Sequence, residues 1–238
     1  MLLLIMDGLK NESQDELYQA LSLATDEELD QIATVLFKRQ FNPLDYLIAP
    51  PVAEVQSKSR AELIEAIAER FKFLAADGLT VLRGEAKKIS YRRVLERVCQ
   101  YLKVKYKCSQ SVEEIESELF LHLIERSWRN LTPSEQEAYA KPVAGELPSS
   151  NPASLLIKGG TAIAFTKLRS QIVATLAKRT AVSAIGQYAA VRTLLGILTP
   201  ALWGIFLADL GWRAIATNYG RIIPVIFILA QIRLLRDV

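Results

Sequence analysis

The last third of the chain, Leu155 to Leu235, constrains the fold most, because it is apolar, rich in Ala and Gly, and nearly free of acidic residues. Between Thr180 and Ala208 the only charged residue is Arg192, and the run Ile222 to Ile232 contains none. Soluble proteins rarely leave contiguous apolar surface of this extent in water. Other helices, lipid or a partner must therefore cover this segment, and the function of the chain depends on which of them does.

Charge is divided unevenly along the chain. Of its 29 basic and 26 acidic residues, ten and two respectively follow Ser150, so this last part carries a net charge of +8 and the preceding part −5. With 50% hydrophobic and 23% charged residues, the composition is that of a folded protein rather than a disordered one. A basic, apolar last part indicates an anionic partner surface, either a membrane or a nucleic acid.

Compartment is predicted from the cysteines and the first residues. Cys99 and Cys108 form neither a CxxC pair nor a disulfide framework, which is typical of free thiols in a reducing compartment. The apolar opening Met1 to Met6 is too short for a signal peptide and lacks a basic start and a cleavage site. We expect a cytoplasmic protein, at the cytoplasmic face of a membrane and not secreted.

One short pattern recurs in the first part of the chain, namely Ser or Thr followed three residues later by Glu. In such a pair the hydroxyl and the carboxylate each accept a backbone hydrogen bond of the other residue, which starts a helix. The pairs are Ser13/Glu16, Thr25/Glu28, Ser59/Glu62, Ser111/Glu114 and Thr132/Glu135. No alternating strand pattern competes with these signals. We therefore predict an all-α, multi-helical fold.

Apolar residues spaced by three and four predict the buried faces of these helices. The predicted core positions are Leu17, Leu21, Leu29, Ile32, Ala33, Leu36, Leu63, Ile67, Phe71, Leu74, Tyr91, Val94, Leu95, Val98, Leu102, Ile115, Leu119 and Leu123.

Two proline-containing stretches, Phe41 to Lys58 and Lys141 to Ser154, divide the chain. They predict a short N-terminal helical module over residues 1–45, a helical middle domain over 55–145, and an apolar, basic C-terminal helical region over 155–238. The amphipathic helices belong to the first two units.

The sequence offers no support for an enzyme or for a bound cofactor or metal. His122 is the only histidine and lies beside Leu119 and Leu123 on a predicted helix, which favours a structural histidine over a catalytic base. One histidine and two distant cysteines do not make a zinc site. Lys158 to Thr161 lacks the order of a phosphate-binding loop.

A basic stretch, Arg83 to Lys107, offers an alternative function. Arg92, Arg93, Arg97 and Lys103 are predicted to lie opposite the apolar face, and tyrosines interleave with them. Such a face suits a nucleic-acid backbone with base stacking. The competing interpretation is an ordinary solvated outer face.

Three interpretations of the apolar third remain open. It can span a bilayer, which needs about 20 mostly apolar residues; it can lie in the membrane interface, with aromatic rings and arginines at headgroup level; or it can be a buried core. The predicted membrane or partner contacts are Arg192, Trp203, Phe206, Trp212, Arg213, Tyr219 and Arg221.

Three stretches resemble the YaaW family of uncharacterised bacterial proteins: Asp77 to Leu102 with Arg83-Gly84, Leu123 to Glu135, and Ile223 to Arg233. The middle stretch is also similar to the ubiquinol–cytochrome c chaperone domain. The chain departs from the family where Glu85-Ala86 follows Arg83-Gly84 in place of a second glycine. The resemblance implies no activity, but it implies a chaperone-like middle domain that can hold an apolar protein client.

The predicted function is a non-enzymatic, membrane-associated helical protein, an assembly or chaperone-like factor for membrane proteins whose partner is lipid or an apolar client. The alternatives are a soluble nucleic-acid-binding or regulatory protein that uses the basic face, and a membrane-permeabilising stress effector.

Overall fold

The computed structural model describes residues 15–38, 49–76, 80–81, 83–130, 132–134 and 218–236. These residues form helices and, within the same ranges, no strand, so the predicted all-α fold is confirmed. The helices are α2 (Glu16–Leu23), α3 (Asp26–Phe37), α5 (Val52–Gln56), α6 (Arg60–Ala75), the 3-10 turn η1 (Ala86–Lys88), α8 (Tyr91–Leu102), α9 (Val112–Asn130) and α14 (Tyr219–Arg236).

Three of the predicted helix starts are confirmed by their hydrogen bonds. Before α3, the amide of Thr25 donates to the Glu28 carboxylate at 2.8 Å, and Thr25 Oγ1 accepts from the Glu28 amide at 3.3 Å. Ser59 and Glu62 pair in the same way before α6, and so do Ser111 and Glu114 before α9.

The start of α2 differs from the prediction. Asp15 caps this helix by accepting a hydrogen bond from the Leu17 amide at 3.1 Å, and Glu16 is the first residue of the helix rather than the third. The prediction that Glu16 closes a capping pair was therefore wrong, because Asp15 provides a carboxylate cap closer to the first turn. Ser13 and Glu135 lie outside the described residues.

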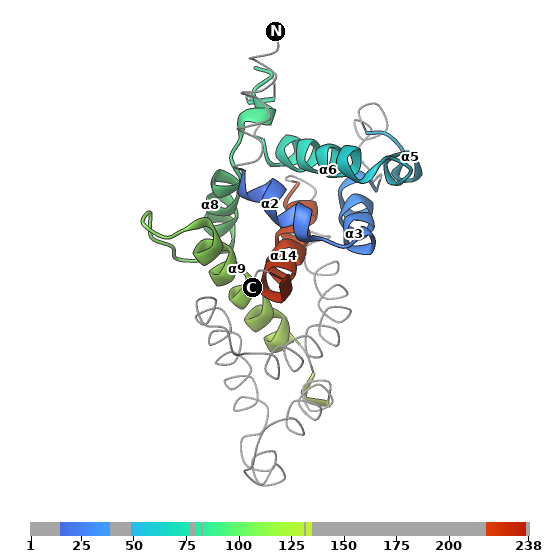
Figure 1. The fold of residues 1–238 in the computed structure, drawn as a ribbon. Helices are drawn as coiled ribbons and strands as arrows, with labels where there is room; N and C mark the ends of the chain where they lie inside the picture. Colours follow the sequence, from blue (N-terminus) through green and yellow to red (C-terminus); the bar gives the residue numbers. More distant parts are fainter. Residues whose placement is uncertain are drawn as a thin grey trace.

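Helix α14 occupies the centre of the described helices (Figure 1). It packs against α2, α3, α6, α8 and α9. Nine of its apolar residues are at most 5% exposed, and they lie on every side of the helix: Ile222, Ile223, Val225, Ile226, Phe227, Ile228, Leu229, Ala230 and Ile232. A helix that is apolar all round is stable only when it is surrounded, and here these five helices pack around it.

All eighteen predicted core positions are buried, as their three-and-four spacing indicated. Leu17, Ile67 and Ile226 come from the three predicted units of the chain and belong to one hydrophobic core. The predicted boundaries between these units stay a prediction.

Helix α8 ends at a residue in the left-handed conformation. Lys103 has φ +60° and ψ 32°, and the Val104 amide donates to the Cys99 carbonyl at 2.8 Å. This closure turns the chain out of the helix and starts a stretch without regular secondary structure, from Val104 to Lys107, on the way to α9.

Candidate functional site

The beginning of α14 is tied to the ends of two other helices through polar side chains. Asn218 Nδ2 donates to the carbonyl of Leu74, near the end of α6, at 3.1 Å. Arg221, which is 4% exposed, donates from Nη2 to the carbonyl of Lys38, just past α3, at 2.9 Å. Helix C-termini present carbonyls without intrahelical partners, so these donors satisfy both the helix ends and the buried arginine.

The end of α14 is tied to α2 and α3 by Arg236. Its Nη2 donates to Glu28 Oε1 at 2.9 Å, a second bond runs from Nη1 to Glu28 Oε2, and Nη1 also donates to the carbonyl of Leu23 at 3.1 Å. Burial raises the pKa of Glu28, but the hydrogen bonds from Arg236 and from the Thr25 amide outweigh it, and the pKa lies below its ordinary value of 4.5. A bidentate pair of this kind fixes the orientation of the guanidinium relative to the carboxylate as well as the distance between them.

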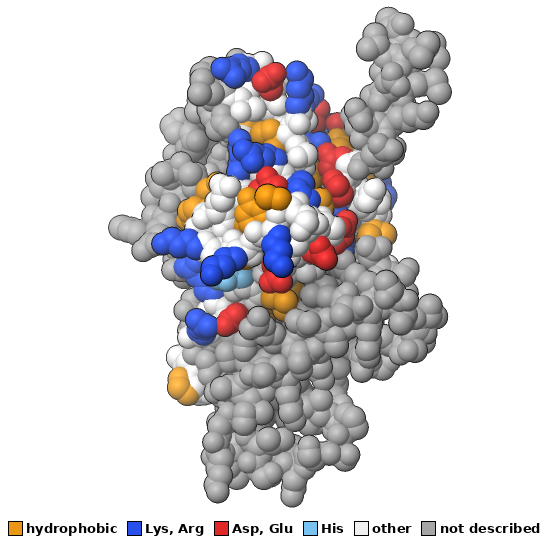
Figure 2. Space-filling view, turned by 90° about the vertical axis from the view of Figure 1, so that its left-hand side faces the viewer, with side chains coloured by type: hydrophobic (Ala, Val, Ile, Leu, Met, Phe, Trp, Pro, Cys, Tyr) orange, Lys and Arg blue, Asp and Glu red, His pale blue; other side chains and the backbone are white. Residues whose placement is uncertain are grey.

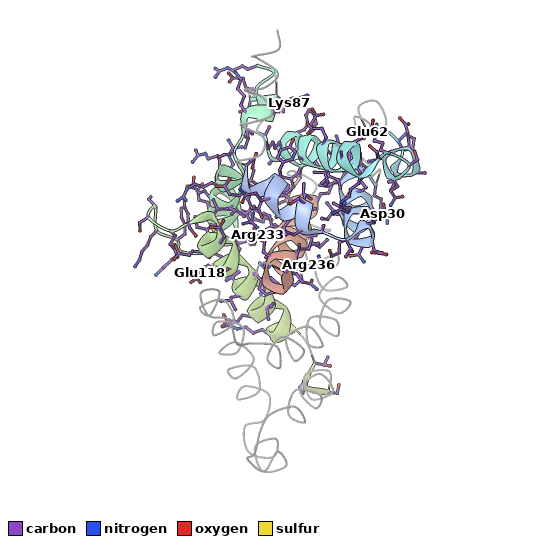
Figure 3. All side chains as sticks on the ribbon, in the orientation of Figure 1. Asp30, Glu62, Lys87, Glu118, Arg233 and Arg236 are labelled. Carbon is purple, nitrogen blue, oxygen red and sulfur yellow. The ribbon has the colours of Figure 1, made fainter. Side chains whose placement is uncertain are left out.

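A buried ionic network surrounds Arg233, which lies on α14 among the other helices (Figure 3). Arg233 Nη1 donates to Glu113 at 3.1 Å, its Nε lies 3.7 Å from Glu116 Oε1, and Nη2 donates to the carbonyl of Glu16. The Tyr91 hydroxyl donates to Glu116 Oε2 at 2.6 Å, and the guanidinium lies 5.9 Å from the Tyr91 ring centre.

This network is enclosed, and its chemistry is structural. Tyr91, Glu116 and Arg233 are 0%, 2% and 2% exposed. Burial, followed by the negative charge of Glu116, raises the pKa of Tyr91 well above its ordinary value of 10.0, so the phenol keeps its proton. The network joins α8, α9 and α14 through groups that have almost no contact with solvent, apart from the partly exposed Glu113.

The other titratable groups of note also respond to burial. The pKa of His122 is lowered, first by burial and then by the positive charge of Arg126. Burial raises the pKa of the Cys99 thiol to about 12, whereas Cys108 is exposed. No group of three or more His, Cys, Asp or Glu side chains is arranged to hold a metal ion within the described ranges.

The predicted membrane or partner contacts divide into two groups. Tyr219 is half-buried and stacks on Tyr101, with ring centres 4.4 Å apart, and Arg221 is the buried donor to α3 described above. The structure thus places these two residues on the core helix. The remaining predicted contacts lie outside the described residues: Arg192, Trp203, Phe206, Trp212 and Arg213.

The predicted basic face is largely occupied by internal bonds. Arg92 and Arg93 both pair with Glu96 at 3.2 Å, so their charges are partly neutralised on α8 itself. Arg97 donates to the carbonyl of Ala75 at the end of α6, at 2.8 Å. Only Lys103 extends from the end of the helix as an exposed cation without an ion pair in the described part of the chain.

Sequence reasoning missed Arg233 and its partner Glu116, although one signal was present. The buried apolar positions of α9 are Val112, Ile115, Leu119, Phe120, Leu123 and Ile124, and Glu116 occupies an apolar position in this register. A carboxylate in a core register indicates a buried cationic partner, because an unpaired buried charge is too costly. The first basic residue after the uncharged run of α14 is that partner.

Of the helices that the structure describes, none combines the length and the apolarity needed to cross a membrane. No protein-family model, curated protein or solved structure matches the chain. The resemblance to the YaaW family and to the chaperone domain therefore stays a prediction.

Proposed function

We propose that the chain is a non-enzymatic, membrane-associated helical protein that acts at the cytoplasmic face as an assembly or chaperone-like factor for membrane proteins. In this proposal the described helices are a carrier, and residues 155–217 contact membrane lipid or an apolar protein client. The proposal rests on the position of this segment in the chain and on its charge.

The observation that carries the proposal is that α9 and α14, which flank this segment in the sequence, pack together in one core. Phe120 of α9 stacks on Phe227 of α14, with ring centres 4.8 Å apart, and Arg233 bonds to Glu113 at the start of α9. The chain on both sides of the segment therefore belongs to the same set of helices, so whatever the segment binds is linked to the carrier at both ends.

The charge of the segment supports an anionic membrane as its first partner. The basic residues of α14 are used inside the fold, but residues 151–217 hold seven further Lys and Arg against the single acid Asp209. Near an anionic bilayer each basic residue contributes about 1 kcal/mol to binding. Apolar residues between the basic ones add burial in the interface.

The contacts of Arg233, Arg92 and Arg97 give no support to an enzyme or to a nucleic-acid-binding protein. The enclosed network around Arg233 offers no site for catalysis, and Arg92 and Arg97 donate to backbone carbonyls instead of extending toward a nucleic acid. No structural observation specifically favours the nucleic-acid or the permeabilising alternative.

Flotation of the full chain with lipid vesicles tests the proposal. We expect the protein to float with vesicles of phosphatidylcholine and phosphatidylserine, and less with phosphatidylcholine alone. Lys178→Glu with Arg179→Glu should weaken binding about 30-fold or more, from two lost contributions of about 1 kcal/mol each. The matched control is the adjacent exposed pair of η1, with Lys87→Glu and Lys88→Glu, which should leave flotation unchanged.

Extraction of cell membranes with alkaline carbonate then separates integral from peripheral attachment. Two results together would overturn the proposal. The full-length protein would stay at the bottom of the flotation gradient with either vesicle, and it would be found in the supernatant after carbonate extraction. Equal loss in both charge-reversal pairs would show that net charge, and not the segment, governs binding.

A further inference from the structure

The stretch Lys103 to Lys107 alternates in character with a period of two. Lys103, Lys105 and Lys107 are exposed, whereas Val104 and Tyr106 are partly buried and pack against the core. We call these three exposed lysines, which alternate with two partly buried residues, the lysine strip.

The strip is held in place by hydrogen bonds from α8 and from its own turn. Arg92 donates from Nη1 to the carbonyl of Gln110 at 2.7 Å and from Nη2 to that of Cys108 at 2.8 Å. The amide of Lys107 donates to the side chain of Gln110 at 2.6 Å. The backbone of the strip is thus organised before any partner binds, which lowers the entropic cost of binding.

The three ammonium groups have no carboxylate partner among the described residues. The closest acids in the sequence are engaged elsewhere: Glu96 pairs with Arg92, and Glu113 pairs with Arg233. Figure 2 shows the side of the molecule that carries α8, α9 and their connection, where Lys and Arg gather toward the left-hand half and acids toward the right. The strip therefore presents uncompensated positive charge.

An aromatic pair lies next to the strip. Tyr101, two residues before Lys103, is 38% exposed and stacks on Tyr219, the first residue of α14. Asn218 and Tyr219 are also the first described residues after the segment that we propose to contact the membrane. Tyrosine rings beside lysines are typical of the headgroup level of a bilayer.

We infer that the lysine strip, with Tyr101 and Tyr219, is a second membrane contact, which binds anionic lipid headgroups and sets how the carrier faces the bilayer. The inference rests on the proposed function, since the chain must reach the membrane for the strip to meet headgroups. The inference adds two points to the proposed function, namely anionic lipid headgroups as the partner and a defined orientation of the carrier on the bilayer. An anionic lipid surface is favoured over a nucleic acid because the strip adjoins the end of the apolar segment.

The test compares full-length variants in binding to vesicles of phosphatidylcholine with phosphatidylserine. The strip variant combines Lys103→Asn, Lys105→Gln and Lys107→Gln, with Asn chosen because it tolerates the left-handed conformation. The control variant removes the same charge through Lys58→Gln, Lys87→Gln and Lys88→Gln. We expect the strip variant to bind on the order of 100-fold more weakly, and the control within about 3-fold of the parent, because distant exposed charges are screened by salt.

Orientation is measured with an environment-sensitive fluorophore on Cys108, which is exposed next to the strip while Cys99 is buried. Its emission should shift to the blue on vesicle binding. A label moved to the turn after α5, through Cys108→Ser with Ser57→Cys, should not shift, since α5 lies across the molecule from the connection between α8 and α9 (Figure 1).

The outcomes separate the two proposals. If the parent floats and the strip variant floats equally well, the inference falls and the proposed function stands. If the parent binds no vesicle, the inference fails, and the proposed function fails with it when alkaline carbonate also releases the protein from cell membranes. If the parent binds no vesicle but is retained on single-stranded RNA through the strip, the partner is a nucleic acid and the inference is overturned.

Discussion

Replacing Arg233 by Met tests whether the ionic network of α14 is a buried part of the core. The variant keeps most of the side-chain volume but leaves the carboxylate of Glu116, which is 2% exposed, without its cation. Breaking a buried pair from one side costs about 3–5 kcal/mol. We expect the lower end, about 3 kcal/mol, because the Tyr91 hydroxyl still donates to Glu116. Such a loss raises the unfolded fraction about 150-fold.

Urea unfolding followed by far-ultraviolet circular dichroism measures this loss. With a slope of about 1–3 kcal/mol per molar urea, the midpoint should fall by about 1–3 M while the slope stays constant. Arg129→Met is the control, because Arg129 is 74% exposed and pairs with Glu125, one turn before it on α9. An exposed pair of this spacing contributes about 0.3–0.5 kcal/mol.

A double variant shows whether the two charges are coupled. Arg233→Met combined with Glu116→Gln removes both charges while the Gln carbonyl can still accept from Tyr91. The pair should therefore cost about 1–3 kcal/mol less than the sum of the single variants. If Arg233→Met costs no more than Arg129→Met, or if the two single losses simply add, Arg233 is not held by a buried carboxylate and the description of the core is wrong.

Three further predictions follow from burial and charge. Phe227→Ala removes a ring that is 3% exposed and should lower the free energy of unfolding by about 3–5 kcal/mol; a loss below about 1 kcal/mol would mean that α14 is not central. Burial raises the pKa of Glu28, but hydrogen bonds from Arg236 and Thr25 together outweigh it and lower the pKa, so the stability from this carboxylate is complete above pH 4.5 and is lost as pH falls through the lower folded-state pKa. The melting temperature of Glu28→Gln should thus fall less between about pH 6 and about pH 3 than that of the parent; parallel curves would contradict the pairing. A thiol reagent at neutral pH should modify Cys108 in the folded protein and Cys99 only after unfolding, since burial raises the pKa of Cys99 to about 12; equal rates would exclude this burial.

Most of the described helices could be predicted because their signals are local. The pairs at Thr25, Ser59 and Ser111 start helices through bonds between residues three apart, and the apolar spacing shows which face is buried. The exception at α2 is also local, since Asp15 and Ser13 are both good caps and the sequence does not rank them.

The surroundings of α14 could not be predicted from its residues. An uncharged run such as Ile222 to Ile232, flanked by Arg221 and Arg233, suits a membrane as well as a protein interior, because both are apolar. Whether α14 is surrounded by lipid or by protein depends on the presence of five other helices with complementary apolar faces. That is a property of the tertiary structure and not of the α14 sequence. Glu116 was the one local signal, because a carboxylate in a core register requires a partner in the interior.

The lysine strip was only partly visible in the sequence. Lys103 was included in the predicted basic face because it continues the helical spacing of α8. The left-handed turn at Lys103 ends that helix, and beyond it the exposed Lys105 and Lys107 alternate with the partly buried Val104 and Tyr106.

The central position of α14 has a consequence for biosynthesis. Its first residue, Tyr219, follows Asn130, the last residue of α9, by 219 − 130 = 89 residues. At a translation rate of about 5–20 residues per second, roughly 4–18 s pass between the two. During that interval the ribosome makes the apolar segment, after the helices from α2 to α9 and before α14, around which they pack. The apolar segment is therefore available to a bilayer or a chaperone before the carrier can close.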